Sequence, residues 1–185
     1  MLDFVLWNLE WVMLPTALAG IGHMLVVRFS VAESLARPLW TRGFGPNKTW
    51  RGVFVMVAGT AAVTAVFAGS QTPPVPTSPA LWGAGLGLAY VVAELPNSWI
   101  KRRLGIPAGS QSAKHPVWSG LGDKLDSATL GAVLLGLWVP SDPDGFHLTA
   151  ELGFAEVFAL SLAVNAGMHA VISALLVAAG LKKSF

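Results

Sequence analysis

The positive charges of this chain are confined to three polar intervals, and long apolar segments separate these intervals from one another. Five of the twelve Lys and Arg residues lie between positions 28 and 51, five between 101 and 124, and two at 182 and 183. The polar turns in between, near 71–79 and 141–156, carry no Lys or Arg. Because positive charge is retained on the cytoplasmic side of membrane proteins, this alternation predicts a chain that crosses a membrane several times.

The composition also indicates a membrane protein. Hydrophobic residues make up 54% of the 185 residues and charged residues only 12%, whereas a soluble domain carries about 25% charged residues. Several apolar runs approach the ~20 residues that a helix needs to cross the ~30 Å hydrocarbon core. Cysteine is absent, which excludes disulfides, a thiolate nucleophile and a metal site built on cysteine.

We therefore predict an all-α polytopic membrane protein that forms one integral membrane domain with five transmembrane helices. The N-terminus is expected outside and the C-terminus in the cytoplasm, because all cations then face the cytoplasm and six of the ten acids face outward. A four-span arrangement would scatter the cations over both faces. The predicted spans cover residues 11–29, 53–70, 80–100, 122–139 and 157–181, with cytoplasmic loops at 30–52 and 101–121.

The lengths of the apolar runs draw three carboxylates toward membrane depth. The apolar run 81–93 covers only ~20 Å at ~1.5 Å per residue, so Glu94 must lie within the cytoplasmic leaflet. The same argument for 128–139 brings Asp126, and with it Asp123, to the start of the fourth span. Carboxylates that meet at this depth need a cation, and oxygen ligands suit Mg²⁺. Two alternatives stay open: an aspartate that caps its helix, and acids that pair with nearby cations.

The interval 97–127 is the longest polar stretch between apolar segments and the first candidate phosphate-binding segment. It opens with three consecutive cations, Lys101–Arg103, and such side chains suit phosphate. An ordinary cytoplasmic flank is the alternative interpretation. The sequence assigns no role to His23, His115 or His169.

The loop 43–52 is the second candidate phosphate-binding segment. It holds Lys48 and Arg51 three residues apart, beside glycines that permit close approach of the backbone. Asn47 and Thr49 add hydrogen-bond donors. The alternative is a basic anchor at the membrane surface.

The run Gly45-Pro-Asn-Lys-Thr-Trp-Arg-Gly52 is similar to a GxNKTWRG loop. Asn97 to Gly109, followed by Gly122-Asp-Lys-Leu-Asp-Ser127, is similar to an SFIKRRLGI segment and a D-x-x-D signature. Together these stretches resemble the CDP-archaeol synthase family, a branch of the membrane cytidylyltransferases related to phosphatidate cytidylyltransferase. A weaker match at His169 and Gly180-Leu-Lys182 extends the resemblance from Gly43 to Lys182.

The resemblance implies transfer of CMP from CTP to a lipid phosphate, giving a CDP-lipid and pyrophosphate, with Mg²⁺ as cofactor, in phospholipid biosynthesis. The lipid would be archaetidic-acid-like, with a phosphatidic-acid-like substrate as the alternative. By their positions in the matching motifs, the catalytic residues would be Asp123, Asp126, Lys101 and Arg102. The metal would be held by Asp123, Asp126 and Glu94. The remaining substrate contacts fall to Asn47, Lys48, Thr49, Arg51, Ser98 and Arg103.

Two other functions were weighed against this enzyme. A CDP-alcohol phosphotransferase also uses membrane aspartates and Mg²⁺, but it needs a longer cluster of four acids than this chain provides. A small transporter or lipid-binding protein, with acids lining a polar cavity, would show inverted repeats and polar groups through the full depth. The enzyme is favoured because the acids cluster in the cytoplasmic half.

We accordingly expect a multi-pass protein of the cell membrane whose active site faces the cytoplasm. The expected partners are CTP, a lipid phosphate and membrane lipids, with no nucleic acid. A homodimer is left open by the sequence.

Overall fold

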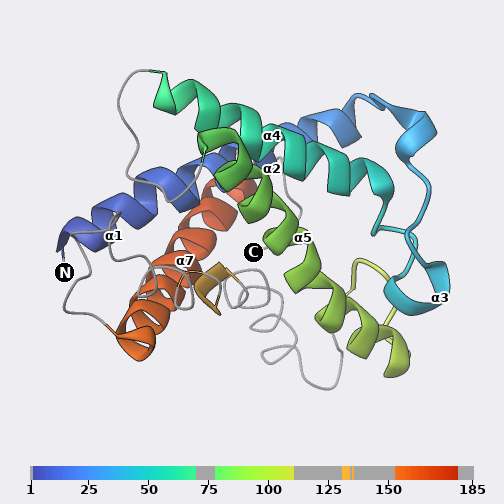
Figure 1. Cartoon of the computed structure of the whole chain (residues 1–185). Helices are drawn as coiled ribbons and strands as arrows, with labels where there is room; N and C mark the ends of the chain where they lie inside the picture. Colours follow the sequence, from blue (N-terminus) through green and yellow to red (C-terminus); the bar gives the residue numbers. More distant parts are fainter. Residues whose placement is uncertain (1, 70–77, 111–130, 134, 136–152, 179–185) are drawn as a thin grey trace.

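The computed structural model describes residues 2–69, 78–110, 131–133, 135 and 153–178, and this part of the chain is helical throughout apart from turns and one isolated bridge, between Pro38 and Thr49. The all-α prediction is therefore confirmed for these residues. Figure 1 shows how the longer helices pack across one another, together with the short helix α3 (Thr41–Phe44). The longer helices are α1 (Leu2–Asn8), α2 (Leu14–Arg28), α4 (Trp50–Ala68), α5 (Pro79–Arg103) and α7 (Phe154–Ala178).

Three stretches of helix in the described part of the chain are long and apolar enough to cross a membrane: Leu2–Arg28, Trp50–Ala68 and Phe154–Leu175. They correspond to the predicted spans 11–29, 53–70 and 157–181. The first begins earlier than predicted, because α1 continues into α2 through a π-helical segment, Leu9–Met13. The third predicted span, 80–100, coincides with the helix α5, which is not one of these three stretches, so its crossing of the membrane stays a prediction. The fourth, 122–139, lies outside the described residues except for helical positions 131–133 and 135, so the count of five stays a prediction.

Polar side chains are buried in this protein while large apolar side chains are exposed, which is the arrangement expected in lipid. Asn8, Thr60 and Ser161 are fully buried. Phe29 and Val66, by contrast, are 70% and 73% exposed. In water this distribution would be unfavourable, but in a bilayer apolar side chains face lipid tails and polar ones find partners between helices. The packing therefore agrees with an integral membrane protein.

Helices α4 and α5 lie backbone against backbone at two glycines one helical turn apart, Gly83 and Gly87. A Cβ on Gly87 would come within 2.5 Å of the carbonyl oxygen of Met56, and one on Gly83 within 2.5 Å of the carbonyl oxygen of Thr60. The buried hydroxyl of Thr60 donates back to the Met56 carbonyl at 2.7 Å, and that of Thr64 to the Thr60 carbonyl at 2.8 Å, so both hydroxyls have partners on their own helix. Small residues at this spacing let membrane helices approach closely.

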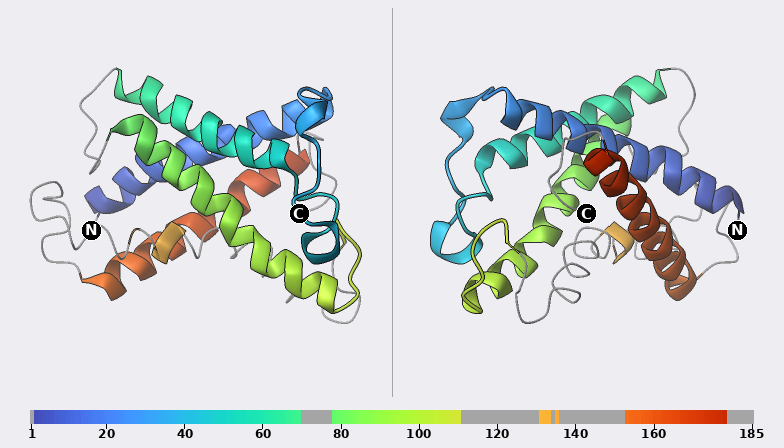
Figure 2. Two further views of the ribbon diagram at one scale, coloured as in Figure 1. Left: turned by 45° about the vertical axis from the view of Figure 1, so that its right-hand side comes forward. Right: turned by 180° about the vertical axis from the view of Figure 1, so that it is seen from behind.

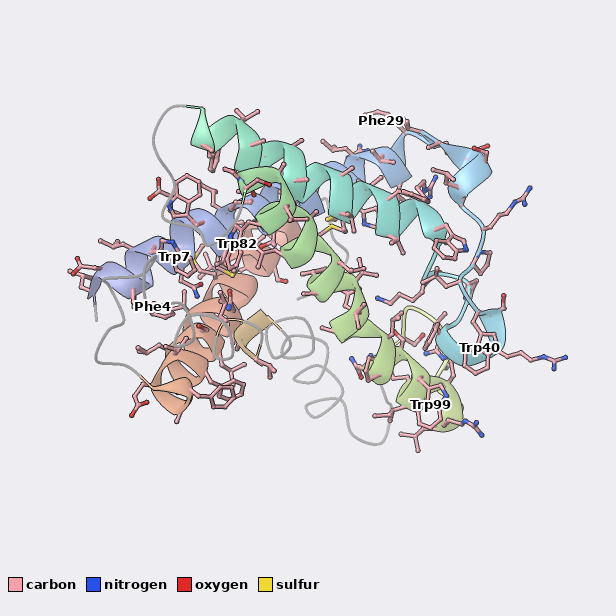
Figure 3. All side chains as sticks on the ribbon, viewed as in Figure 1. Phe4, Trp7, Phe29, Trp40, Trp82 and Trp99 are labelled. Atoms are coloured by element: carbon pink, nitrogen blue, oxygen red, sulfur yellow. The ribbon has the colours of Figure 1, made fainter. Side chains whose placement is uncertain are left out.

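An aromatic cluster joins α1 to α5. The ring centroids of Trp7 and Trp82 are 5.9 Å apart, and those of Phe4 and Trp7 are 5.8 Å apart; Figure 3 shows these three side chains together near the N-terminus. The indole of Trp82 also donates a hydrogen bond to the carbonyl of Trp11 at 3.0 Å. Since Pro15 has no N–H to offer that carbonyl, the indole supplies the missing donor. This bond fixes α5 against the first helix.

The three cations predicted to open the loop 101–121 instead form the last turn of α5. The helix ends in a Schellman motif: the N–H of Ile106 donates to the carbonyl of Lys101 at 2.9 Å, and the N–H of Gly105 to that of Arg102 at 3.1 Å. Gly105 has φ +72°, a conformation that glycine adopts at little cost. Cations are favoured at a helix C-terminus by the helix dipole, which explains why the helix extends through them.

The charges of the described residues are separated in space as well as in sequence. The eight described Lys and Arg residues all lie in the last turn of α2, the connection to α4, the first turn of α4 or the last turn of α5. Figures 1 and 2 show that these segments gather on one side of the molecule, away from the N-terminus and the start of α7. This side, which we call the basic end, holds the loop 43–52 and the described part, 97–110, of the other candidate phosphate-binding segment.

Candidate active site

The two candidate phosphate-binding segments lie against each other at the basic end. A Cβ on Gly45 would lie 3.1 Å from Nη1 of Arg102 and 3.3 Å from the Cβ of Ala108. The amide nitrogen of Asn47 lies 3.4 Å from the position that a Cβ on Gly109 would take. Gly45 and Gly109 both have positive φ, +87° and +77°, so glycine suits these two turns. Tertiary packing therefore joins two stretches that are distant in the sequence.

The loop between α2 and α4 is folded and holds Lys48 in a fixed place. Main-chain hydrogen bonds run from the N–H of Leu39 to the carbonyl of Lys48 at 2.7 Å, and from the N–H of Trp50 to the carbonyl of Arg37 at 3.0 Å. The hydroxyl of Thr49 caps α4 by accepting a backbone N–H of its first turn. The backbone of this loop is therefore organised by its own hydrogen bonds.

A cavity of about 320 Å³ opens beside this loop, between α2, α4, α5 and α7. Its charged side chains gather where the loop meets α2 and α5, whereas the rest of its wall is mainly apolar, with Thr16, Tyr90 and Ser173 as further polar side chains. The polar part is formed by His23, Asn47, Lys48, Thr49 and Glu94. The rest of the wall includes Met13, Ala17, Gly20, Ile21, Val53, Met56, Val91 and Ile172. The cavity thus has a polar end and an apolar end.

An ion pair between Lys48 and Glu94 forms the centre of the polar end. Each side chain is 25% exposed, so the pair is screened less than one at an open surface. The sequence predicted Lys48 as a phosphate contact and Glu94 as a metal ligand, and the structure brings these two residues into direct contact. The pairing leaves both within reach of a ligand, because both line the cavity.

Comparison with protein families identifies the family of the chain that forms this cavity. A model described as the cytidylyltransferase family matches residues 34–140, which is more than half of the chain and includes both candidate phosphate-binding segments. The chain belongs to the cytidylyltransferase family. Membership implies a nucleotidyltransferase. Searches of curated proteins and of solved structures each gave no match.

The other cations predicted for a cytidylyltransferase site lie around the cavity rather than in its wall. Arg51 donates to the carbonyl of Val31 at 3.3 Å. Arg102 donates to the carbonyl of Pro107 at 3.0 Å and thereby supports the turn that follows α5. The described residues offer no hydrogen-bond partner to the buried Nε atom of either arginine.

Arg103 and the polar residues near it lie at the end of α5. The guanidinium of Arg103 lies over the ring of Trp99, 5.0 Å from its centroid, which is a cation–π contact. Figure 3 labels Trp99 and Trp40, both of which lie at the basic end. Ser98 and Lys101 are half-buried on the same helix and do not line the cavity.

The predicted metal site can be tested only in part. Asp123 and Asp126 lie outside the described residues, and so does His115. Within the described residues, no three acidic or histidine side chains are grouped to hold a metal. Glu94 offers a carboxylate of suitable chemistry, and it is already paired with Lys48. The described part of the site therefore fits one ligand of a magnesium ion, and two predicted ligands are left to the residues that follow α5.

Four polar residues of the cavity wall received no site role from the sequence: Thr16, His23, Tyr90 and Ser173. His23 lies against the start of α4, where its Nε2 would be 3.3 Å from a Cβ on Gly52. The sequence signal for His23 was its helical spacing from the other cavity residues of the first helix. That signal is weak, because a lone membrane histidine is usually an ordinary hydrogen-bonding residue. Ser173 is buried on α7. The side chain of His169, a weaker match to the family, lies outside the described residues.

Proposed function

We propose that the protein transfers CMP from CTP to a lipid phosphate that is archaetidic-acid-like or phosphatidic-acid-like, and so makes a CDP-lipid and pyrophosphate. The observation that carries this proposal is the cavity with one polar and one apolar end, placed where the two candidate phosphate-binding segments meet. A lipid phosphate has the same division between a charged head and a hydrocarbon part. CTP is accounted for by membership of the cytidylyltransferase family.

The reaction makes limited demands on the protein. An oxygen of the lipid phosphate attacks the α-phosphorus of CTP, a new P–O bond forms, and the bond to the β-phosphate breaks to release pyrophosphate. The nucleophile is already anionic, so no general base is needed. The protein must orient two polyanions and offset the charge that develops between them.

Lys48 is proposed to contact a phosphate oxygen at the polar end. It projects from a loop whose backbone is held by hydrogen bonds to its neighbours, so little order has to be gained on binding. Glu94 holds the ammonium group of Lys48 in place until substrate binds. Asn47 and Thr49 extend the same edge of the cavity.

Mg²⁺ is the proposed cofactor, and Asp123, Asp126 and Glu94 would hold it. When bound, the ion would neutralise phosphate charge and polarise the bond to the leaving pyrophosphate. Glu94 could serve the metal once a phosphate has taken its place beside Lys48. The five-span arrangement with the site facing the cytoplasm belongs to the same proposal, and the gathering of the described cations at one end supports it.

The proposal is tested with purified protein in lipid nanodiscs, Mg²⁺, CTP labelled at the α-phosphate, and a panel of lipid phosphates. The expected result is label in a CDP-lipid and equimolar unlabelled pyrophosphate. The Lys48→Met variant should lose most of this activity. Arg37→Met is the matched control, since the Arg37 side chain is exposed and only its backbone carbonyl is used. Wild-type protein that consumes no CTP with any lipid phosphate would refute the proposed function.

A further inference from the structure

One face of α2 forms a wall of the cavity, and a glycine lies at its centre. The cavity-lining residues of the first helix follow a helical repeat: Met13, Thr16, Ala17, Gly20, Ile21, His23 and Met24. At roughly 100° per residue, Gly20 lies near the middle of this set. Its substituent direction is therefore toward the cavity. An added Cβ would meet no atom within 4 Å, so the space in front of Gly20 is open.

Gly22 provides the natural comparison. It lies two residues further along the same helix, about 200° around the axis, and it does not line the cavity. A Cβ on Gly22 would also meet no atom within 4 Å. The two glycines therefore differ in which face they occupy and not in local crowding.

The cavity extends away from the loop along this wall. From Met24, beside the polar end, to Met13 the first helix advances roughly 16 Å at ~1.5 Å per residue. That distance is about half of the ~30 Å hydrocarbon core. The wall opposite Gly20 comes from α4, α5 and α7, and it includes Met56, Val91 and Ile172. Unbranched methionine side chains adapt to an irregular apolar ligand.

The volume limits what this space can hold. About 320 Å³ lies at the low end of the ~300–1,000 Å³ found for ligand pockets. This is too little for a nucleoside triphosphate together with a lipid. Away from the polar end, the polar side chains that line the cavity are those of Thr16, Tyr90 and Ser173, and none of them carries the positive charge that a triphosphate would need. A single hydrocarbon chain fits both the size and the chemistry.

We propose that the apolar end of the cavity binds the first part of one hydrocarbon chain of the lipid phosphate, and that Gly20 is a specificity-determining residue that keeps this chain site open. The inference rests on the proposed function, since it places the phosphate of the same lipid near Lys48. The chain-facing walls on the first helix and α7 lie outside the residues matched to the family, 34–140. The family match therefore does not define which chain this protein accepts.

The test compares Gly20→Leu with Gly22→Leu on two lipid phosphates that share one head group, one with long chains and one with very short chains. One methylene more or less in a hydrophobic pocket is worth roughly 10- to 200-fold in kcat/KM. Gly20→Leu should lower kcat/KM by that order for the long-chain substrate, with little change for the short-chain one and in KM for CTP. Gly22→Leu should resemble wild type on both. Equal losses on both substrates, or no loss on either, would overturn the inference.

A second readout does not depend on turnover. A long-chain lipid phosphate with a photoreactive group on its chain is cross-linked to wild type and to both variants, and the labelled peptides are identified by mass spectrometry. Labelling of Met13 or Met56 in wild type and Gly22→Leu, and its loss in Gly20→Leu, supports the chain site even if no CDP-lipid forms. Labelling confined to other positions would overturn it while leaving the proposed reaction untouched.

Discussion

The contact between α4 and α5 leads to a sharp prediction about stability. Gly87→Ala places a Cβ 2.5 Å from the Met56 carbonyl oxygen and 2.9 Å from the Val57 Cα, which are backbone atoms that cannot rotate away. The two helices must therefore move apart. Gly85→Ala, two residues earlier on the same helix, adds a Cβ that meets no atom within 4 Å. The two substitutions are chemically identical and differ only in what the new methyl group meets.

The magnitude follows from two opposing effects. Replacing glycine by alanine within a helix is favourable by about 0.5–1 kcal/mol, and this gain is common to both variants. Overpacking typically costs about 1–3 kcal/mol, and only Gly87→Ala incurs that cost. The difference in unfolding free energy between the variants should therefore be about 1–3 kcal/mol. For a chain of this size each kcal/mol shifts Tm by about 2–4 °C, so Gly87→Ala should melt several degrees below Gly85→Ala.

The assay is thermal unfolding in one detergent, followed by circular dichroism and by loss of monodisperse protein on size exclusion. Wild type should melt between the two variants. If the Tm of Gly87→Ala equals or exceeds that of Gly85→Ala, the close approach of α4 to α5 at Gly87 is refuted. A result in which both variants fall equally would show that the effect belongs to α5 itself and not to its contact with α4.

Three further predictions address the charges. Lys48→Met should lower Tm because it leaves Glu94 without its partner. The double variant Lys48→Met/Glu94→Gln should recover Tm without recovering CTP-dependent activity. Recovery of activity in the double variant would refute a substrate role for Lys48. Asp126→Asn should lower turnover by orders of magnitude, whereas near-normal CDP-lipid formation would indicate a helix cap, since Asn caps as well as Asp. In this cysteine-free chain, a cysteine at Ser112 should be labelled only from the cytoplasm and one at Ser141 only from outside, and labelling of both from one side would end the five-span arrangement.

The sequence was sufficient to predict helices wherever hydropathy alone determines the structure. The spans that became α4 and α7 needed only length and apolar composition. The first helix was predicted too short, because Asp3 and Glu10 resemble a polar flank. In the structure both acids are exposed while Phe4 and Trp7 between them are buried against α5 and its neighbours. One-sided burial of a short amphipathic turn depends on a partner that the sequence does not identify.

The site was predictable as a set of segments and not as a set of contacts. The family resemblance joined the two candidate phosphate-binding segments, and the structure places them together through Gly45 and Arg102. The pairing of Lys48 with Glu94 could not be predicted, because it depends on how α5 lies against the loop. The place of His23 in the cavity wall could not be predicted either. It depends on the position of α4, which no local sequence pattern encodes.

The unbroken helix from Leu2 to Arg28 has a consequence for how the protein lies in its bilayer. Its 27 residues extend for roughly 40 Å at ~1.5 Å per residue, against a hydrocarbon thickness of ~30 Å. A helix of this length is accommodated by tilting or by leaving the turn that carries Asp3 outside the hydrocarbon core. Because the indole of Trp82 ties this helix to α5, the two must tilt as a unit. A change in the thickness of the surrounding membrane would then change the tilt of both helices. Because both helices line the cavity, its shape would change with their tilt.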